Sequence, residues 1–362
     1  MNATMCRFLL MSASLFFFVF FADGSTVQAK DAPEILSEIN KLSASERKAR
    51  LIAGAKKEGK VIYYASGNVR DNQKMVIAFK KRYPFLDVEY SGGGGSKIVQ
   101  RTHTEFLAKH YVVDVVNSNA FRMPTLLNSN VLGRYESPHH RNLLKALTDS
   151  KLRFSPLYTT AIVIGYNAME VPAEKAPKSY LDLIKPRWKG NKMALDTEAH
   201  SWFMGILGTM GEEKALEYSR KLATQGLVRR RGHTLMTQLL AVGEYNIQIE
   251  SYLHSLISLK EKGAPINYVV TDPLILRPPS VVGLARKSPR PHAAALFIDY
   301  LLSPEGGQKV FAAQKRWPAN TKTASKFTVK GVKTWAPLLD EWLPKQKQVL
   351  NTFDEVFGAK AR

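Results

Sequence analysis

Two patterns of hydrophobic and polar positions alternate along the first half of the chain. Short apolar runs, such as residues 61–66 ("VIYYAS") and 86–91 ("LDVEYS"), are typical of strands. Between them lie segments such as residues 71–84 and 96–110, in which apolar residues recur at helical spacing. Strands that alternate with helices of about 10 to 15 residues pair in parallel, so the pattern predicts an open α/β sheet.

The same alternation returns in the second half, beginning with a strand at residues 192–196 and a helix at 198–210. Extended apolar runs at residues 155–167 and 271–286 could each cross between two halves. We therefore expect two lobes, each an open and mostly parallel sheet flanked by helices, joined by two hinge strands. The predicted boundaries are 1–29 for a signal peptide, 30–161 and 272–330 for lobe 1, 162–271 for lobe 2, and 331–362 for a helical tail.

The N-terminal segment has the pattern of a secretory signal. Residues 9–22 are almost wholly apolar, Arg7 precedes them, and small residues end at Ala29, which predicts cleavage before Lys30. The apolar run is shorter than the roughly 20 residues that span a membrane. Cys6 lies before this run, where a lipoprotein cysteine would follow it, so we expect a periplasmic protein and not a lipoprotein. The remaining chain has no cysteine for a disulfide, a thiolate nucleophile or a metal site.

The net charge of +21 favours anionic partners. Lysines and arginines are spread over the whole chain, which leaves open a small acidic solute, an anionic membrane surface, or a basic surface without a specific role. Export makes nucleic acid a poor partner, and we expect none.

Four consecutive glycines, Gly92–Gly95, separate a predicted strand from a predicted helix. They do not form a P-loop, because Ser96 precedes Lys97 instead of following it. They also lack the third glycine of the dinucleotide fingerprint, where Lys97 stands. A flexible linker is disfavoured by the tight spacing on either side. Gly95 and Ser96 are instead expected to begin a helix whose free N–H groups and partial positive charge bind an anion.

The loops that follow the predicted strands supply the candidate ligand contacts. Ligands of open α/β sheets bind beyond the carboxyl ends of the strands. In the first half this rule selects Ser66, Asn68, Gly95, Ser96 and Asn119. In the second half it selects Asp196, Thr197, Trp202, His233, Ser251 and Tyr252. Two such sets would face each other across a cleft, although Trp202 could be a core residue and His233 could have a capping or packing role.

Enzyme motifs are poorly represented, and no cofactor is expected. The chain contains neither a Gly-x-Ser-x-Gly elbow nor a His-Glu-x-x-His pair. One catalytic alternative stays open: a secreted hydrolase or transferase in which His233 works with Asp196 or Glu250 as acid and base. A sensor component that docks on a membrane kinase is another alternative.

Six stretches, in order over most of the chain, resemble the periplasmic solute-binding proteins of ABC importers, in the group that includes ferric-iron binders. The stretches are "LIAGAKKEGKVIYYAS", "FKKRYPFLDVEY", "LDLIKPRWKGNKMALDTE", "RRRGHTLMTQLLAVGEYNI", "KEKGAPINYV" and "AALFIDYLLSPEGGQ". The resemblance implies the two-lobed type II periplasmic binding fold, whose lobes close over a solute. It also implies a monomer that delivers a small solute to an inner-membrane permease and its ATPase, without catalysis.

The ferric site of that group matches this chain at only one of its four ligands. The iron binders usually have histidine where this chain has Asn68, glutamate where it has Asn119, and paired tyrosines where it has Ser251 and Tyr252. Fe³⁺ prefers several anionic oxygens, so this set favours a small organic or inorganic anion and no resident metal. Ferric iron or an iron chelate, with Tyr252 as a contact, is the alternative solute.

Overall fold

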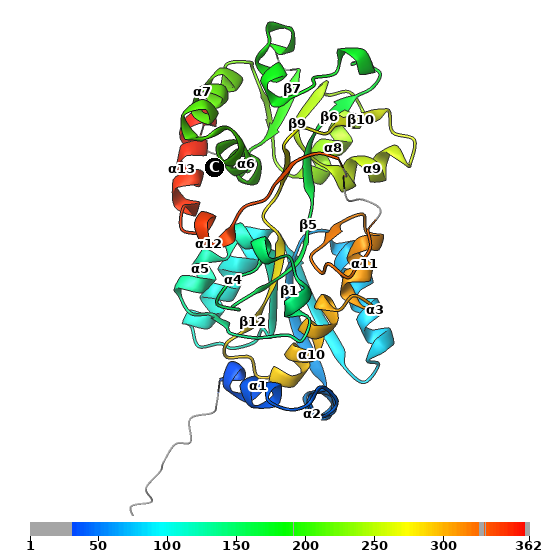
Figure 1. The fold of residues 1–362 in the computed structure, drawn as a ribbon, viewed down its shortest axis with the longest axis vertical. Coiled ribbons are helices and arrows are strands. Elements are labelled where there is room, and N and C mark those ends of the chain that lie inside the picture. Colours follow the sequence, from blue (N-terminus) through cyan, green and yellow to red (C-terminus); the bar gives the residue numbers. More distant parts are fainter. Residues whose placement is uncertain (1–30, 191, 326–328, 330, 359–362) are drawn as a thin grey trace, which may run out of the picture. The chain divides into compact units, whose positions relative to one another are not determined.

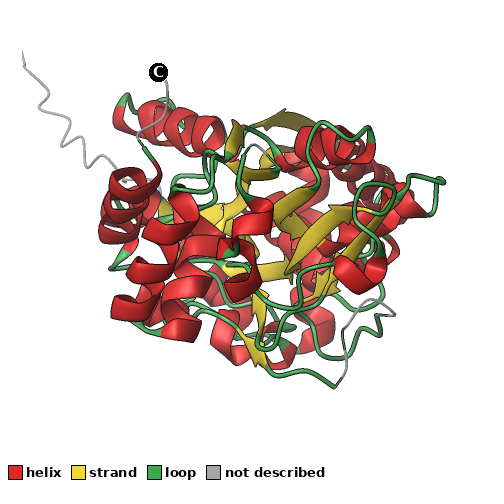
Figure 2. Cartoon of the chain, turned by 90° about the horizontal axis from the view of Figure 1, so that it is seen from above, coloured by secondary structure: helices red, strands yellow, loops and turns green. Residues whose placement is uncertain are grey.

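The computed structural model describes residues 31–190, 192–325, 329 and 331–358, and these form two mixed β-sheets flanked by helices (Figure 1). Viewed from above, the helices surround the strands (Figure 2). The predicted signal peptide lies outside the described residues. Among the described helices, none is both long enough and apolar enough to span a membrane.

The first sheet has the strand order β13-β5-β12-β3-β1-β2, with β4 paired to β12, and we call this part lobe 1. Its strands are β1 (Lys60–Ser66), β2 (Asp87–Gly93), β3 (Val115–Asn119), β4 (Leu132–Gly133), β5 (Ser155–Thr159), β12 (Ser280–Ala285) and β13 (Trp317–Pro318). The helices are α1 (Ala32–Asn40), α2 (Ala44–Glu58), α3 (Val69–Arg82), α4 (Gly95–Leu107), α5 (Pro124–Asn128), α10 (Pro291–Leu302) and α11 (Gly307–Ala313).

The second sheet has the order β14-β11-β6-β9-β7-β8, with β10 paired to β6, and we call this part lobe 2. Its strands are β6 (Ala161–Asn167), β7 (Met193–Asp196), β8 (Val228–Arg230), β9 (Ile247–Tyr252), β10 (Ile266–Val269), β11 (Leu274–Leu276) and β14 (Thr334–Trp335). The helices are α6 (His200–Met210), α7 (Glu212–Ala223), α8 (His233–Ala241), α9 (Leu253–Lys260) and α13 (Gln346–Phe357). The short tail helix α12 (Leu339–Trp342) buries Leu339 in a core cluster of lobe 1 instead.

Local sequence signals explain where the helices begin and end. Ser43 caps α2 in a capping box with Glu46, as the sequence predicts, and Gly59 ends the helix in the left-handed conformation at φ 71°. The helix buries Leu51 and Ala55 in the core of lobe 1. α2 packs on α10, whereas α4 and α10 pack directly on strands of the sheet, so the helices form layers over the first sheet.

The chain crosses between the sheets at Thr160, between β5 and β6, and again at residues 277–279, between β11 and β12. It passes between the sheets once more after β13, because β14 lies in the second sheet, so the lobes have more connections than the two predicted hinge strands. The second crossing lies after the predicted boundary at 272, because Ile275 and Leu276 pair with β6 and keep β11 in the second sheet. Both sheets are also mixed rather than mostly parallel: β12 runs antiparallel to β3 and β5, and β6 runs antiparallel to β9. In each sheet the antiparallel strands include those that adjoin a crossing.

The C-terminal tail contacts both lobes. β14 adds a strand to the second sheet beside β11, so the predicted helical tail begins with a strand. Leu339 and Leu343 then pack in a core cluster of lobe 1, whereas Val349 and Phe353 pack in the core of lobe 2. In Figure 1 the tail, coloured red, runs from α12 near α5 to α13 beside α6 and α7.

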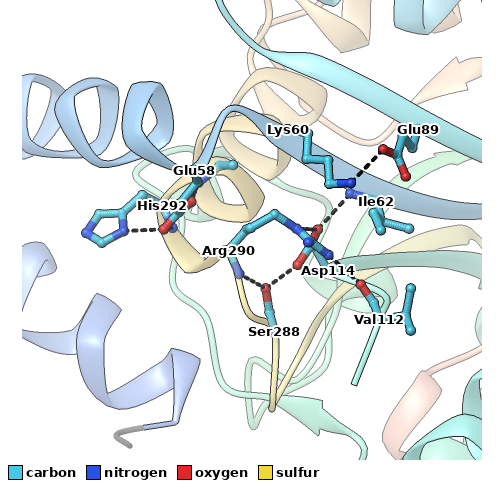
Figure 3. Close-up of polar contacts among 10 residues, drawn as sticks. Glu58, Lys60, Ile62, Glu89, Val112, Asp114, Ser288, Arg290 and His292 are labelled. Atoms are coloured by element: carbon cyan, nitrogen blue, oxygen red, sulfur yellow. Dashed lines mark hydrogen bonds and ion pairs between the residues drawn. The ribbon is translucent and has the colours of Figure 1, made fainter. Parts of the chain in front are cut away.

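A buried ionic network ties β1 and β3 of lobe 1 to the loop before α10 (Figure 3). The fully buried Asp114 accepts hydrogen bonds from the Ile62 amide, the Ser288 hydroxyl and Arg290 Nε, each at 2.7 Å. Burial raises the pKa of Asp114, and the bonds from these three donors oppose that shift. Because Asp114 directly precedes β3, the network fixes the start of this strand, which ends at Asn119.

Candidate functional site

A cavity of about 1190 Å³ lies between the two sheets, lined by residues from both lobes. The loops after β1, β2 and β3 line it from lobe 1, and the loops after β7, β8 and β9 line it from lobe 2. β1, β2 and β3 are mutually parallel, as are β7, β8 and β9, so each set presents its carboxyl ends at one edge of its sheet. The structure brings to this cavity Ser66, Asn68, Gly95, Ser96, Asn119, Asp196, His233 and Tyr252.

Three of the sequence-predicted contacts do not line the cavity. Trp202 is fully buried in the core of lobe 2, with its ring 6.1 Å from that of Tyr180, because it lies on the apolar face of α6. Ser251 is also fully buried, and its side chain points away from that of Tyr252, since successive residues of a strand face opposite sides. Thr197 donates its backbone N–H to Arg230 and positions the loop after β7.

The N-terminus of α4 opens onto the cavity without a side-chain cap. The first N–H groups of a helix have no intrahelical partner and carry a partial positive charge, so this end favours an anion. Gly95 has a further role that the sequence does not reveal. A Cβ atom there would lie 2.9 Å from Arg122 Cδ, so glycine makes room for the arginine that donates to Ser96 Oγ.

Positive side chains predominate around the cavity: nine lysines and arginines line it, against four aspartates and glutamates. Arg277, in the second crossing, lies over the ring of Tyr252 at 4.8 Å. Within the described residues, its guanidinium has no carboxylate in ion-pair range, and its buried Nε has no hydrogen-bond partner. Arg277 is therefore a cation available to a ligand in the cavity.

The lobe 2 wall holds a cluster of ionisable groups, Asp196, His233 and Glu250, whose ligand atoms lie within 4.8 Å of one another. Asp196 accepts hydrogen bonds from the amides of Glu198 at 2.7 Å and Gly232 at 2.8 Å, so it also positions the loops after β7 and β8. Such a group could hold a metal ion or pair internally, with the histidine as the cation.

The positions that correspond to ferric ligands offer little anionic oxygen. Asn68 Oδ1 accepts from the Asp71 amide and caps α3. Asn119 donates to Pro278 O at 2.8 Å and accepts from the Phe121 amide at 2.9 Å. Burial raises the pKa of Tyr252, which keeps the phenol protonated.

Ion pairs join the lobes on either side of the cavity. Arg122 of lobe 1 contacts Glu198 of lobe 2 at 3.1 Å, and Lys315 of lobe 1 pairs with Glu261 of lobe 2. Gln346 of the tail donates to Phe121 O and also lines the cavity. Apolar packing also joins the lobes, because Phe121 of lobe 1 is buried in the core cluster of lobe 2.

Sequence reasoning missed Arg122, Arg277 and Gln346. Arg122 follows Asn119 by three residues, so the rule for loops after strands could have found it. Arg277 precedes two prolines in the second crossing, and a hinge position next to the cleft is a usable signal. Nothing in the local sequence of Gln346 indicates a role in the cavity, because its place depends on tail packing.

Comparisons with known proteins agree with this geometry. A family model described as bacterial extracellular solute-binding protein matches residues 102–338. An uncharacterised protein of Haemophilus influenzae is 23% identical over 288 residues, which cover 74% of this chain and 82% of that protein.

Solved structures resemble the fold at low sequence identity. The periplasmic binding protein P5PA is 22% identical, with a TM-score of 0.72, over 83% of this chain and 99% of its own. AfuA of Actinobacillus pleuropneumoniae, solved with fructose-6-phosphate bound, is 18% identical, with a TM-score of 0.73 and the same coverage. Iron-bound HitA of Pseudomonas aeruginosa is 16% identical, with a TM-score of 0.70, over 82% and 99% of the two chains.

Proposed function

The chain belongs to the bacterial extracellular solute-binding proteins and is the solute-binding component of an ABC importer, and from this premise we propose that its solute is a small anion held in the cavity between the lobes. The loaded protein, exported with its signal peptide removed and working as a monomer, then delivers the anion to an inner-membrane permease and its ATPase. Catalysis is no part of this role.

The unpaired cation of Arg277 is the observation that carries the proposal. Arg277 is half-buried, and its buried Nε has no partner among the described residues, so a ligand that supplies negative charge and an acceptor would offset the cost of removing this atom from water. The uncapped N-terminus of α4 faces the same cavity from lobe 1. An anion between these two groups would contact lobe 1 and the second crossing together, so its binding would favour closure of the lobes.

The related AfuA structure contains a sugar phosphate, which combines an anionic group with hydroxyls. A ligand of that kind suits a cavity in which cations and a helix N-terminus predominate and a few carboxylates can accept from hydroxyls. An iron–anion complex is the second candidate, since HitA is an iron-bound relative in fold and Tyr252 lines the cavity. In that case the anion would again be bound by Arg277 and α4.

A thermal-shift panel tests the proposal, with inorganic phosphate, fructose 6-phosphate, citrate and ferric citrate as anionic probes and fructose and putrescine as neutral and cationic probes. A ligand at 100 times its dissociation constant stabilises the folded protein by roughly 2.7 kcal/mol. We expect at least one anion to raise the melting temperature, and small-angle scattering to show closure with it. Stabilisation only by neutral or cationic solutes would contradict an anionic ligand, and turnover abolished by His233→Ala would favour the hydrolase alternative.

A further inference from the structure

Glu250 lies directly behind the cavity wall of lobe 2. It is 1% exposed on β9 and does not line the cavity itself. Its Oε1 is 3.2 Å from Nδ1 of His233, and Oδ2 of Asp196 is 3.9 Å from the same nitrogen. These are ion-pair distances, because Nδ1 and Oε1 lack the geometry of a hydrogen bond. Both carboxylates thus approach one nitrogen of the imidazole from within the lobe.

The imidazole of His233 is held on a second side by Tyr252. The two ring centroids are 3.9 Å apart, with 37° between the ring planes. His233 is also the first residue of α8, so the helix fixes its backbone. Nδ1 is buried, yet 23% of the side chain is exposed and the residue lines the cavity. Nε2 is therefore the ring nitrogen that faces the solute.

We propose that Glu250 is a positioning residue, which holds His233 through Nδ1 so that Nε2–H donates to the anionic group of the solute. The inference rests on the proposed function and adds a donor from lobe 2 to the N-terminus of α4 in lobe 1. Both lobes would then bind the anionic group of the solute, so closure of the lobes would depend on the negative charge of the solute.

The charges around His233 agree with this role. The groups that face it from the elements packed against it are Asp196, Glu250, Tyr252, His254 and Arg277. Burial by itself would lower the pKa of His233, but the charges of Glu250 and Asp196 outweigh burial and Arg277, and the pKa is raised. An imidazolium carries a hydrogen on both nitrogens, so His233 can pair with the charge of Glu250 on its Nδ1 side while Nε2–H donates to the solute.

The test replaces Glu250 by Gln, which keeps the shape and removes the charge. The chain provides a matched control in Glu58→Gln, because Glu58 Oε1 pairs with Nδ1 of His292 at 2.7 Å in lobe 1, away from the cavity (Figure 3). Nitrogen-15 NMR of histidine-labelled protein without solute follows the protonation of His233. We expect His233 to lose its proton at a lower pH in Glu250→Gln than in the wild type and in Glu58→Gln, and Glu250→Asp to restore part of the difference. An unchanged titration in Glu250→Gln would overturn the proposal.

A binding experiment with inorganic phosphate as the probe adds the functional readout. We expect Glu250→Gln to weaken phosphate binding by about 10- to 100-fold at pH 7, as for the loss of a charge-assisted hydrogen bond, and Glu58→Gln to have no effect. Equal affinity of Glu250→Gln and the wild type would overturn the role. If phosphate does not bind the wild type, phosphate is excluded as the solute of the proposed function, and the NMR titration decides on Glu250. Tight Zn²⁺ binding that Glu250→Gln abolishes would instead identify a cation site and overturn the proposal.

Discussion

Replacing Arg277 by Met separates the binding of an anion from the stability of the fold. Methionine keeps much of the apolar stem and its packing on Tyr252, but removes the guanidinium. Because Arg277 has no carboxylate partner among the described residues, its loss leaves no buried acid unpaired. The substitution should therefore affect the solute far more than the free protein.

The magnitude follows from the contacts. A hydrogen bond to a charged group contributes about 1.5 to 3 kcal/mol, which corresponds to roughly a 10- to 150-fold loss of affinity. The free energy of unfolding loses only the stacking of the cation on Tyr252, at 4.8 Å, worth about 0.5 to 1 kcal/mol. A loss of binding free energy that is larger than the loss of unfolding free energy indicates that Arg277 binds the ligand more than it stabilises the fold.

Isothermal titration calorimetry with the most stabilising anion of the thermal-shift panel measures the first effect, and urea unfolding without ligand measures the second. Arg187→Met is the matched control, since Arg187 also stacks on an aromatic ring, that of Trp188 at 4.7 Å, but lies outside the cavity. Affinity of Arg277→Met within threefold of the control, or a loss of stability as large as the loss of binding energy, would refute the reasoning.

Three further predictions concern the scaffold of the cavity. Arg290→Met leaves Asp114 buried without its cation and should lower the free energy of unfolding, measured in urea, by about 3 kcal/mol or more. Lys60→Met breaks a half-exposed ion pair and should lower it by less than about 1 kcal/mol. Equal effects of the two substitutions would contradict the network of Figure 3. Phe353→Ala removes a fully buried ring between the tail and lobe 2 and should cost about 3 to 5 kcal/mol, so a change below 1 kcal/mol would show that the tail is not packed there. Burial and nearby arginines place the pKa of His254 well below its usual value. The stability that its neutral form contributes is therefore complete above about pH 6.5 and is lost as the pH falls. The melting temperature should drop more between pH 7.5 and 5.5 in the wild type than in His254→Gln, and parallel curves would contradict this.

The architecture was largely predictable because it depends on local patterns. Alternating strand and helix periods specify two α/β lobes, and the carboxyl ends of their strands specify where a ligand can bind. The same rule selects Ser96 and His233, which lie in the first turn of α4 and at the start of α8 and both line the cavity. The capping box of Ser43 was predictable for the same reason, as its partners are three residues apart.

The remaining features depend on contacts that are distant in sequence. The apolar run around Ile275 is equally suited to either sheet, and only its pairing with β6 assigns it to lobe 2. Trp202 lies in a loop-to-helix segment like that of His233, but the helical face that carries it turns toward the core. Gln346 reaches the cavity because α12 and α13 pack on different lobes, which no local pattern specifies.

Native mass spectrometry of the protein purified from its own cells under non-denaturing conditions tests the central claim most directly. The account predicts that a fraction of the protein carries one small molecule, that collisional activation releases it as an anion, and that Arg277→Met purified in the same way lacks it. Release of a neutral or cationic solute, or the same anion retained in full by Arg277→Met, would contradict an anion site built around this arginine.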